Sequence, residues 1–228
     1  MKFSNKKLII FDLDGTLIDS SPDLALAVNH MLSTIGRETF STNTIHYWVG
    51  NGAQTLVKRA LSGSSTIDET IDPTLFEESL EIFLNFYAKN LAVKTVTYPH
   101  VKETLTRLKD ENYTLAIVTN KPFAFVSPIL DALELNEFFK LILGGDSLEE
   151  KKPHPLPLLH ICETLGFSVE EAVMVGDSKN DILAANASNM QSIGLTYGYN
   201  YGEAISIYEP DAVFSDFSDI LSTLIDGE

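Results

Sequence analysis

Short apolar runs alternate with amphipathic stretches through the second half of the chain. Continuous apolar runs predict strands at 113–118, 141–143, 172–175, 192–195 and 212–214. Between these runs, apolar residues recur every three or four positions, and this spacing predicts helices over 101–108, 123–133, 157–165 and 181–186. An earlier apolar run at 8–10 adds a further strand. Short apolar strands that alternate with helices indicate an α/β fold, with a parallel, Rossmann-like sheet covered on both faces.

The pattern changes after the first strand, because no convincing strand occurs between residues 20 and 90. A first helix is expected to begin at a Ser20 or Ser21 cap and to end at Gly36. Two further helices are predicted at 53–61 and 76–87. The chain is therefore predicted to divide into an α/β core, residues 1–19 and 92–228, and a small helical cap inserted after the first strand, residues 20–91.

The composition narrows the classes of partner and compartment. The chain has 228 residues, 44% of them hydrophobic, which is enough for a sizeable core. Its formal net charge of −16 argues against nucleic acid or an anionic membrane as a partner. Cys162 is the single cysteine, which excludes an internal disulfide and fits a reducing compartment. The first apolar run stops at Asp12 and is too short for a signal peptide or a membrane span, so we expect a cytoplasmic protein.

Two aspartates stand directly after the first apolar run, in the string FDLDGT at 11–16. Their spacing places the carboxylates of Asp12 and Asp14 on one side of an extended segment, at the strand end where open α/β sheets bind ligands. Carboxylates held this close repel each other unless a cation or a shared proton relieves them. The pair indicates a hard metal ion, a covalent carboxylate nucleophile, or both. The simpler alternative is a strand followed by an Asp-Gly turn.

Two further segments lie where a predicted strand ends or a helix begins. Thr119 and Asn120 follow the strand at 113–118, so a hydroxyl and main-chain amides are expected at the same sheet edge as Asp12. A helix cap before the following proline would explain the threonine equally well. Lys152 stands just ahead of a predicted helix, where an isolated lysine is more often a solvated surface residue.

A second acidic pair follows the strand at 172–175. Asp177 is expected at the strand tip and Asp181 one helical turn further, so both can reach one point, although a capped helix start is the alternative. The acidic groups suit a hard cation such as Mg²⁺. Lys152, a threonine hydroxyl and main-chain amides suit phosphoryl oxygens. Either aspartate of the first pair could then attack phosphorus.

In their order and spacing, these segments resemble the four motifs of the haloacid dehalogenase-like phosphohydrolase superfamily. The insertion at 20–91 resembles the helical cap of that superfamily, so the resemblance covers essentially the whole chain. Within it, longer strings resemble the bacterial phosphoglycolate phosphatases: WVGNG at 48–52, TNKP at 119–122, KPHP at 152–155, GDSKND at 176–181 and GLTYGYN at 194–200. The resemblance implies a phosphomonoester hydrolase with 2-phosphoglycolate as substrate. A sugar phosphate or a nucleotide stays open as the alternative.

The resemblance also implies a role for each motif residue. Asp12 is implied as the nucleophile that forms a transient aspartyl-phosphate, and Asp14 as the acid that protonates the leaving oxygen and then activates water. Thr119 and Lys152 are implied to hold the transferring phosphoryl group. The implied Mg²⁺ ligands are the Asp12 carboxylate, the Asp14 backbone carbonyl, Asp177 and, nearby, Asp181. The implied phosphate- and substrate-binding residues are Gly15, Thr16, Thr119, Asn120, Lys152, Gly50, Asn51 and Gly52.

The cap is expected to close over the site and to select a small phosphate-ester substrate. Gly50 and Gly52 would let main-chain amides approach a small carboxylate closely. Lys58 or Arg59 on the following helix could pair with that carboxylate, although a solvated helix face is the simpler explanation for both.

Three other functions compete with a phosphatase. A dehalogenase has no need for Asp14, so the second acid argues against it. A β-phosphoglucomutase-like enzyme keeps Asp14 and differs mainly in its cap. A phospho-accepting signalling module carries its aspartate on a later strand and is about half as long, so Asp12 and the insertion both argue against it. Both a monomer and a homodimer fit the pattern.

Overall fold

A sheet of six parallel strands forms the centre of the chain, whose computed structural model describes residues 3–225. The order across the sheet is β5-β4-β1-β6-β7-β8, and every neighbouring pair runs parallel. The strands are β1 (Leu8–Phe11), β4 (Thr114–Val118), β5 (Leu141–Leu143), β6 (Ala172–Gly176), β7 (Gln191–Leu195) and β8 (Ala212–Phe214). The predicted α/β class and each strand predicted from an apolar run are confirmed.

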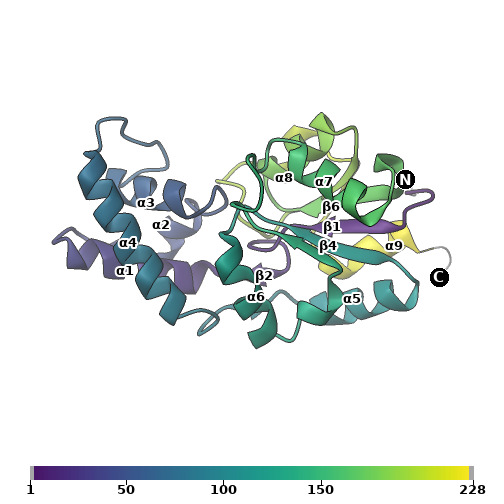
Figure 1. Cartoon of the computed structure of the whole chain (residues 1–228), viewed down its shortest axis with the longest axis horizontal. Coiled ribbons are helices and arrows are strands. Elements are labelled where there is room, and N and C mark those ends of the chain that lie inside the picture. Colours follow the sequence, from purple (N-terminus) through teal and green to yellow (C-terminus); the bar gives the residue numbers. More distant parts are fainter. Residues whose placement is uncertain (1–2, 226–228) are drawn as a thin grey trace.

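Both faces of the sheet are buried, and each has its own apolar core. Ile9 and Phe11 of β1 belong to the larger cluster of buried side chains, whereas Leu8 and Ile10 belong to the smaller one. This is why the strand is apolar at successive positions rather than at alternate ones. The flanking elements are the helices α5 (Val101–Asp110), α6 (Phe123–Ala132), α7 (Leu156–Leu165), α8 (Lys179–Ala187) and α9 (Leu221–Leu224), and the short 3₁₀ helices η1 (Asn136–Phe138), η2 (Val169–Glu171), η3 (Ile205–Tyr208) and η4 (Phe217–Ile220). Figure 1 shows α7 and α8 above the sheet and α5 and α6 below it.

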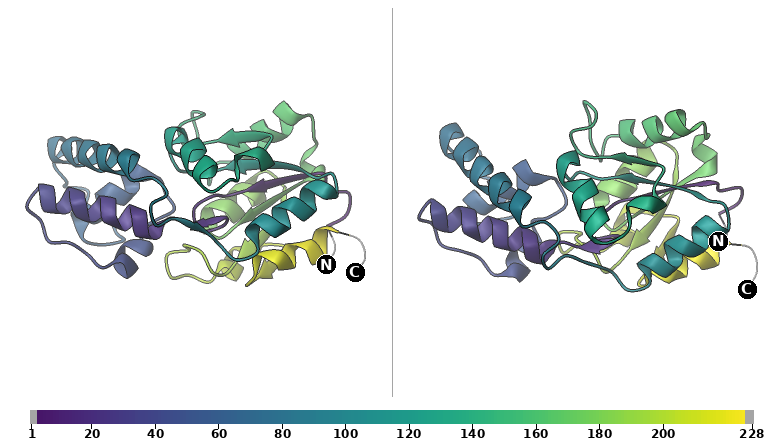
Figure 2. Two further views of the ribbon diagram at one scale, coloured as in Figure 1. Left: turned by 90° about the horizontal axis from the view of Figure 1, so that it is seen from below. Right: turned by 60° about the horizontal axis from the view of Figure 1, so that its bottom comes forward.

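A group of helices follows β1 in sequence and stands beside the sheet rather than on either face, as Figures 1 and 2 show. Its members are α1 (Ser21–Thr34), α2 (Thr42–His46), α3 (Ala53–Ser62) and α4 (Pro73–Lys89). Helix α1 packs along α4, and α3 also contacts α4. The helical, strand-free character expected for 20–90 is observed, although the short helix α2 was not predicted. The division into a core and a cap at 20–91 stays a prediction.

A two-stranded antiparallel ribbon joins the helical group to the sheet. It consists of β2 (Ile18–Asp19) and β3 (Val96–Thr97), one strand on each of the two chain crossings. The Asp23 carboxylate strengthens this junction, because it accepts hydrogen bonds from the main-chain N–H groups of Lys94 and Thr95 and from the Thr95 hydroxyl. The ribbon was not predicted, since strands of two residues carry no periodic signal.

The start of α1 differs from the expected serine cap. Ser20 occupies the cap position, but its side chain makes no hydrogen bond to the helix. Its hydroxyl instead donates to Asp14 Oδ1 at 2.5 Å. The carboxylate of Asp19 binds the start of the helix instead, because its Oδ1 accepts a hydrogen bond from the main-chain N–H of Ser21 at 3.1 Å. The Ser20 side chain therefore holds an acid of the sheet edge and does not cap the start of the helix.

Two smaller expectations concern the cysteine and membrane association. Cys162 lies in α7, where it is buried in the smaller apolar cluster with a free thiol. Burial raises the pKa of that thiol to about 11. Within residues 3–225, none of the helices combines the length and the apolar character that a membrane span requires.

Candidate active site

The carboxyl edge of the sheet brings together acidic and polar groups from distant parts of the sequence. β1 lies between β4 and β6, and Asp12, Thr119 and Asp177 each follow the last residue of one of these strands. The main-chain N–H of Asp12 donates to Val175 O at 3.0 Å, so the sheet extends as far as the first aspartate. Parallel strands end at the same edge, which is why three local motifs become one site.

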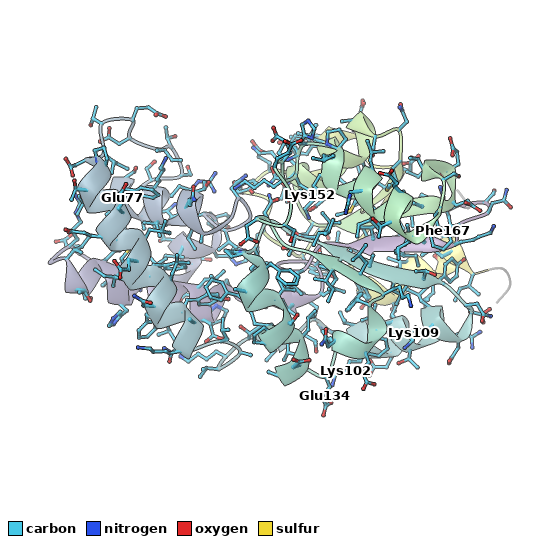
Figure 3. The ribbon with its side chains drawn as sticks, viewed as in Figure 1. Glu77, Lys102, Lys109, Glu134, Lys152 and Phe167 are labelled. Atoms are coloured by element: carbon cyan, nitrogen blue, oxygen red, sulfur yellow. The ribbon has the colours of Figure 1, made fainter. Side chains whose placement is uncertain are left out.

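Lys152 is a buried cation at this edge, not a solvated surface residue. Its Nζ lies 2.9 Å from Asp12 Oδ1 and 2.6 Å from Asp181 Oδ1, and the residue is 2% exposed. Burial by itself lowers the pKa of the ammonium, but the two carboxylates outweigh this and raise the pKa above its usual value. Lys152 is labelled in Figure 3, where it comes from the segment above the sheet, beside the junction with the helical group.

Asp12, Asp177 and Asp181 form a compact cluster of buried carboxylates. One oxygen from each lies within 4.8 Å of the others. Burial raises the pKa of Asp12 to about 7, and burial together with repulsion from Asp181 and Asp12 raises the pKa of Asp177 well above its usual value. Asp12 Oδ1 accepts no aligned hydrogen bond from any described residue. Three buried carboxylates within reach of one point, with one lysine that contacts only Asp12 and Asp181, fit a hard divalent cation.

Neighbouring donors fix the orientation of the second acidic pair. Asp177 Oδ1 accepts from the Thr16 hydroxyl and Oδ2 from the main-chain N–H of Tyr199, both at 2.6 Å. Asp181 Oδ2 accepts from the N–H and the hydroxyl of Ser178, at 3.0 and 2.8 Å, at the start of α8. Its other oxygen, Oδ1, accepts from Lys152 Nζ at 2.6 Å, so both oxygens of Asp181 already have partners. This arrangement suits a residue that positions the other groups.

Gly15 makes room for this cluster. It has φ +95°, and a Cβ added there would lie 2.3 Å from Asp177 Oδ2. Gly198 approaches from the other side, where an added Cβ would lie 2.2 Å from the same oxygen. The glycine after the aspartate pair is thus required both for its left-handed turn and for close packing against an acid. Gly15 and Thr16 both contact Asp177, and neither lines the cavity described below.

Asp14 is separated from the acidic cluster and is held by a different cation. Lys121 Nζ lies 2.9 and 3.0 Å from its two carboxylate oxygens, and Ser20 donates to Oδ1. Lys121 also donates to the hydroxyl of Tyr87 in α4, at 2.8 Å. The sequence predicted no place in the site for Lys121, Tyr87 or Ser20, although Ser20 was expected to cap a helix and Lys121 stands in the string TNKP. Its only signal for Lys121 was the position two residues after the strand-end threonine.

The loop before α3 contacts the sheet edge through its carbonyl groups. Gly50 O accepts from the side-chain amides of Asn120, at 3.3 Å, and Asn180, at 3.2 Å. Asn51 O accepts from Lys151 Nζ at 3.0 Å. Asn120 also donates to the main-chain oxygen of Lys152 at 3.0 Å, so it links this loop to the buried lysine. The glycine loop is therefore placed against the site by hydrogen bonds.

A cavity lies between the loop, α4 and the sheet edge. Its polar lining includes Asp12, Asp14, Thr119, Asn120 and Lys121. The apolar lining comes from both sides of the junction and consists of Leu24, Val49, Ala53, Leu56, Phe83, Pro122 and Phe125, with Gly50, Gly52 and Tyr87 completing the wall. Asn51, which was expected to bind substrate, lies instead at an outer groove beside Lys151 and His154.

Neither cation proposed for the cap reaches this cavity. Lys58 Nζ lies 5.0 Å from the centre of the Phe76 ring, at a separate surface hollow. Arg59 donates to the main-chain oxygen of Trp48 at 2.7 Å and lies over the ring of Tyr201. Lys58 is thus a packing residue at the surface, whereas Arg59 is held by a defined hydrogen bond rather than solvated.

A strand-end aspartate, a lysine, a threonine and a second acidic pair at the carboxyl edge of a parallel sheet are the set expected of a class of hydrolases. The sequence profile of the haloacid dehalogenase-like hydrolases matches residues 9–195, and the chain belongs to this family. The resemblance noted from the motifs is confirmed.

Individual relatives are similar over nearly the full length. The chain is 52% identical to a phosphoglycolate phosphatase of Colwellia psychrerythraea, over 98% of this chain and 99% of that protein. It is 48% identical to a phosphoglycolate phosphatase of Psychrobacter arcticus, over 97% and 96% of the two chains. A crystal structure of a predicted phosphoglycolate phosphatase from Haemophilus somnus superimposes with a TM-score of 0.89 at 42% identity, covering 96% of this chain and 98% of that one.

Proposed function

We propose that this protein is a Mg²⁺-dependent phosphomonoester hydrolase that converts 2-phosphoglycolate and water to glycolate and phosphate. The observation that carries the proposal is the buried Asp12 carboxylate, which lines the cavity and lies beside Lys152 and next to Asp177. The names of relatives at 52% and 48% identity support the choice of substrate.

Asp12 is the proposed nucleophile. One oxygen of the Asp12 carboxylate attacks phosphorus, and the new O–P bond forms as the ester O–P bond breaks. Asp14, held at the cavity by Lys121 and Ser20, gives a proton to the leaving oxygen, so that glycolate departs. The Asp14 carboxylate then takes a proton from water, whose oxygen attacks the aspartyl-phosphate and releases phosphate and Asp12. Thr119 and Lys152 hold the phosphoryl oxygens throughout both steps.

The metal ligands in this proposal are the Asp12 carboxylate, the Asp14 main-chain carbonyl and Asp177, with Asp181 positioned nearby. Mg²⁺ bound there supplies positive charge to the phosphoryl oxygens and relieves the repulsion between the buried carboxylates. Lys152 and the cation together make the crevice locally positive in a chain of net charge −16. An anionic substrate can therefore bind to a strongly acidic protein.

The helical group, residues 20–91, is the proposed cap. It supplies Leu24, Val49, Leu56 and Phe83 to the cavity wall, so its position decides how much water reaches the reacting atoms. The ribbon of β2 and β3 is the proposed joint. A cytoplasmic location agrees with the single buried cysteine, and a monomer or homodimer stays the prediction for the assembly.

The test is release of inorganic phosphate from a panel of esters in the presence of Mg²⁺. The panel contains 2-phosphoglycolate, sugar phosphates and nucleotides, and 2-phosphoglycolate is expected to lead in kcat/KM by about tenfold or more, a difference of ~1.4 kcal/mol. Asp12→Asn should abolish turnover with all of them while the circular dichroism spectrum stays native. If another ester gives the highest kcat/KM, the proposed substrate is wrong and the assignment to the hydrolase class still holds. Turnover by the Asp12→Asn variant would show that Asp12 is not the nucleophile.

A further inference from the structure

Lys121 is the only positively charged residue among those that line the active-site cavity within the described chain. The rest of the wall is largely apolar, apart from Asp12, Asp14, Thr119 and Asn120. A ligand with a second anionic group, besides the phosphoryl group, needs a cation on this wall. Lys152 does not serve, because it does not line this cavity and is already divided between Asp12 and Asp181.

The environment of Lys121 allows one of its donors to be redirected to such a group. The ammonium has three N–H donors, and its oxygen partners are Asp14 and the hydroxyl of Tyr87. Asp14 lies within 2.9 and 3.0 Å through both oxygens, so one of these contacts can be exchanged for a ligand oxygen while the other keeps the pair. Burial raises the pKa of Tyr87 to about 12, so its hydroxyl stays protonated.

The Tyr87 hydroxyl accepts a hydrogen bond from Lys121, which leaves its own proton for a ligand at the cavity. Tyr87 lies in α4 and Lys121 three residues after the end of β4, so the pair spans the junction between the helical group and the sheet. The main-chain N–H of Lys121 donates to the Thr119 hydroxyl at 3.2 Å. The ammonium therefore belongs to the same short loop as the threonine that is proposed to hold the phosphoryl group.

We propose that Lys121, assisted by the Tyr87 hydroxyl, binds the carboxylate of the leaving group and is the residue that selects a phosphorylated 2-hydroxy acid. This inference rests on the proposed function and names the part of the site that recognises the acid. A carboxylate on the carbon next to the ester oxygen lies close to the general acid, and Lys121 is the cation that touches Asp14. The expected cap cations, Lys58 and Arg59, face other surfaces.

The experiment compares two substrates in the full-length enzyme with Mg²⁺. One is 2-phosphoglycolate, and the other is ethyl phosphate, in which a methyl group replaces the carboxylate. The quantity measured is the ratio of their kcat/KM values. Lys121→Met should lower this ratio by about 10²-fold, because truncating one partner of a buried charge pair commonly has an effect of that size or more. Lys121→Arg, which keeps the charge, should retain most of the ratio.

Tyr87→Phe provides a milder variant, which keeps the ring and removes only the hydroxyl. It should lower the ratio by roughly tenfold or less, mainly through KM for 2-phosphoglycolate. The matched control is Lys102→Met on α5. Lys102 pairs with Glu134 at the surface, and Figure 3 shows both at the lower edge of the molecule. The ratio of the two kcat/KM values for Lys102→Met should equal that of the wild type.

The outcomes separate the inference from the proposed function. If the wild type prefers 2-phosphoglycolate and Lys121→Met lowers both rates equally, Lys121 only positions Asp14 and the inference is wrong, while the proposed function stands. If the wild type shows no preference, both the substrate and the carboxylate site are wrong. If Lys121→Met melts far below the wild type, the Tyr87→Phe ratio decides, and an unchanged ratio overturns the inference.

Discussion

The carboxylate of Asp23 is predicted to be a principal stabiliser of the junction between the helical group and the sheet. It is 1% exposed, and its Oδ2 accepts from Lys94 N at 2.9 Å, Thr95 N at 2.9 Å and the Thr95 hydroxyl at 2.7 Å. These donors lie on the segment that enters β3, whereas Asp23 lies in the first turn of α1. The single side chain therefore ties together the two crossings of the chain.

The size of the effect follows from the number of donors that lose their partner. Asp23→Ala leaves three donors without an acceptor, each worth about 1.5–3 kcal/mol when bonded to a charged group. Removing a buried carboxylate also removes its desolvation penalty, so we expect a net loss of about 3–5 kcal/mol in the free energy of unfolding. Asp23→Asn keeps one oxygen, which can accept from all three donors, and should cost about 1–2 kcal/mol.

Urea unfolding followed by circular dichroism measures these differences. With a slope of about 3 kcal/mol per molar urea, Asp23→Ala should lower the midpoint by about 1–1.7 M. The matched control is Asp72→Ala, which removes an exposed aspartate that caps α4 through Leu75 N at 2.9 Å and should cost about 1 kcal/mol. A shift for Asp23→Ala no larger than that for Asp72→Ala would refute the argument.

Two further predictions concern the metal and the pH dependence of stability. Chelation by EDTA should stop phosphate release; Mg²⁺ should restore it and Ca²⁺ should not, because Ca²⁺ requires more ligands at longer distances. Mg²⁺ should also raise the melting temperature by relieving the Asp12, Asp177 and Asp181 cluster, and Asp177→Asn should reduce that rise. Hydrogen bonds from Ser218, and then from His100, lower the pKa of Asp216 to about 2. A depressed carboxyl pKa stabilises the fold above the ordinary value of 3.8 and loses that effect as the pH falls towards 2. The difference in urea midpoint between wild type and Asp216→Ala should therefore shrink over this range, and a constant difference would contradict the assignment.

The predicted elements agree with the structure where a segment is long and its burial uniform. The strands expected at 113–118 and 172–175 are Thr114–Val118 and Ala172–Gly176, because strands buried on both faces are continuous apolar runs. The elements that were missed are short. β2 and β3 have two residues each, and α2 has five, so each is too short for its side-chain period to repeat.

The acidic residues of the candidate site could be predicted from the sequence, whereas its lysines were harder to predict. Asp12 and Asp177 were located because each follows an apolar strand, and parallel strands end at one edge. Lys152 had the weaker signal of a position before a helix. Lys121 had no local signal that separated it from a surface lysine, and its burial depends on Asp14 and Tyr87, which lie 107 and 34 positions away in the sequence.

The sequence by itself determined the class of fold, the helical insertion and the acidic chemistry at the sheet edge. Those features depend on residue type and on spacing within single elements, and both can be read along the chain. Only the tertiary structure decided which cation serves which acid: Lys152 pairs with Asp12, Lys121 pairs with Asp14, and Arg59 turns away to Trp48. The physical reason is that a buried charge is placed by the partners that compensate it, and those partners come from segments brought together only when the chain folds.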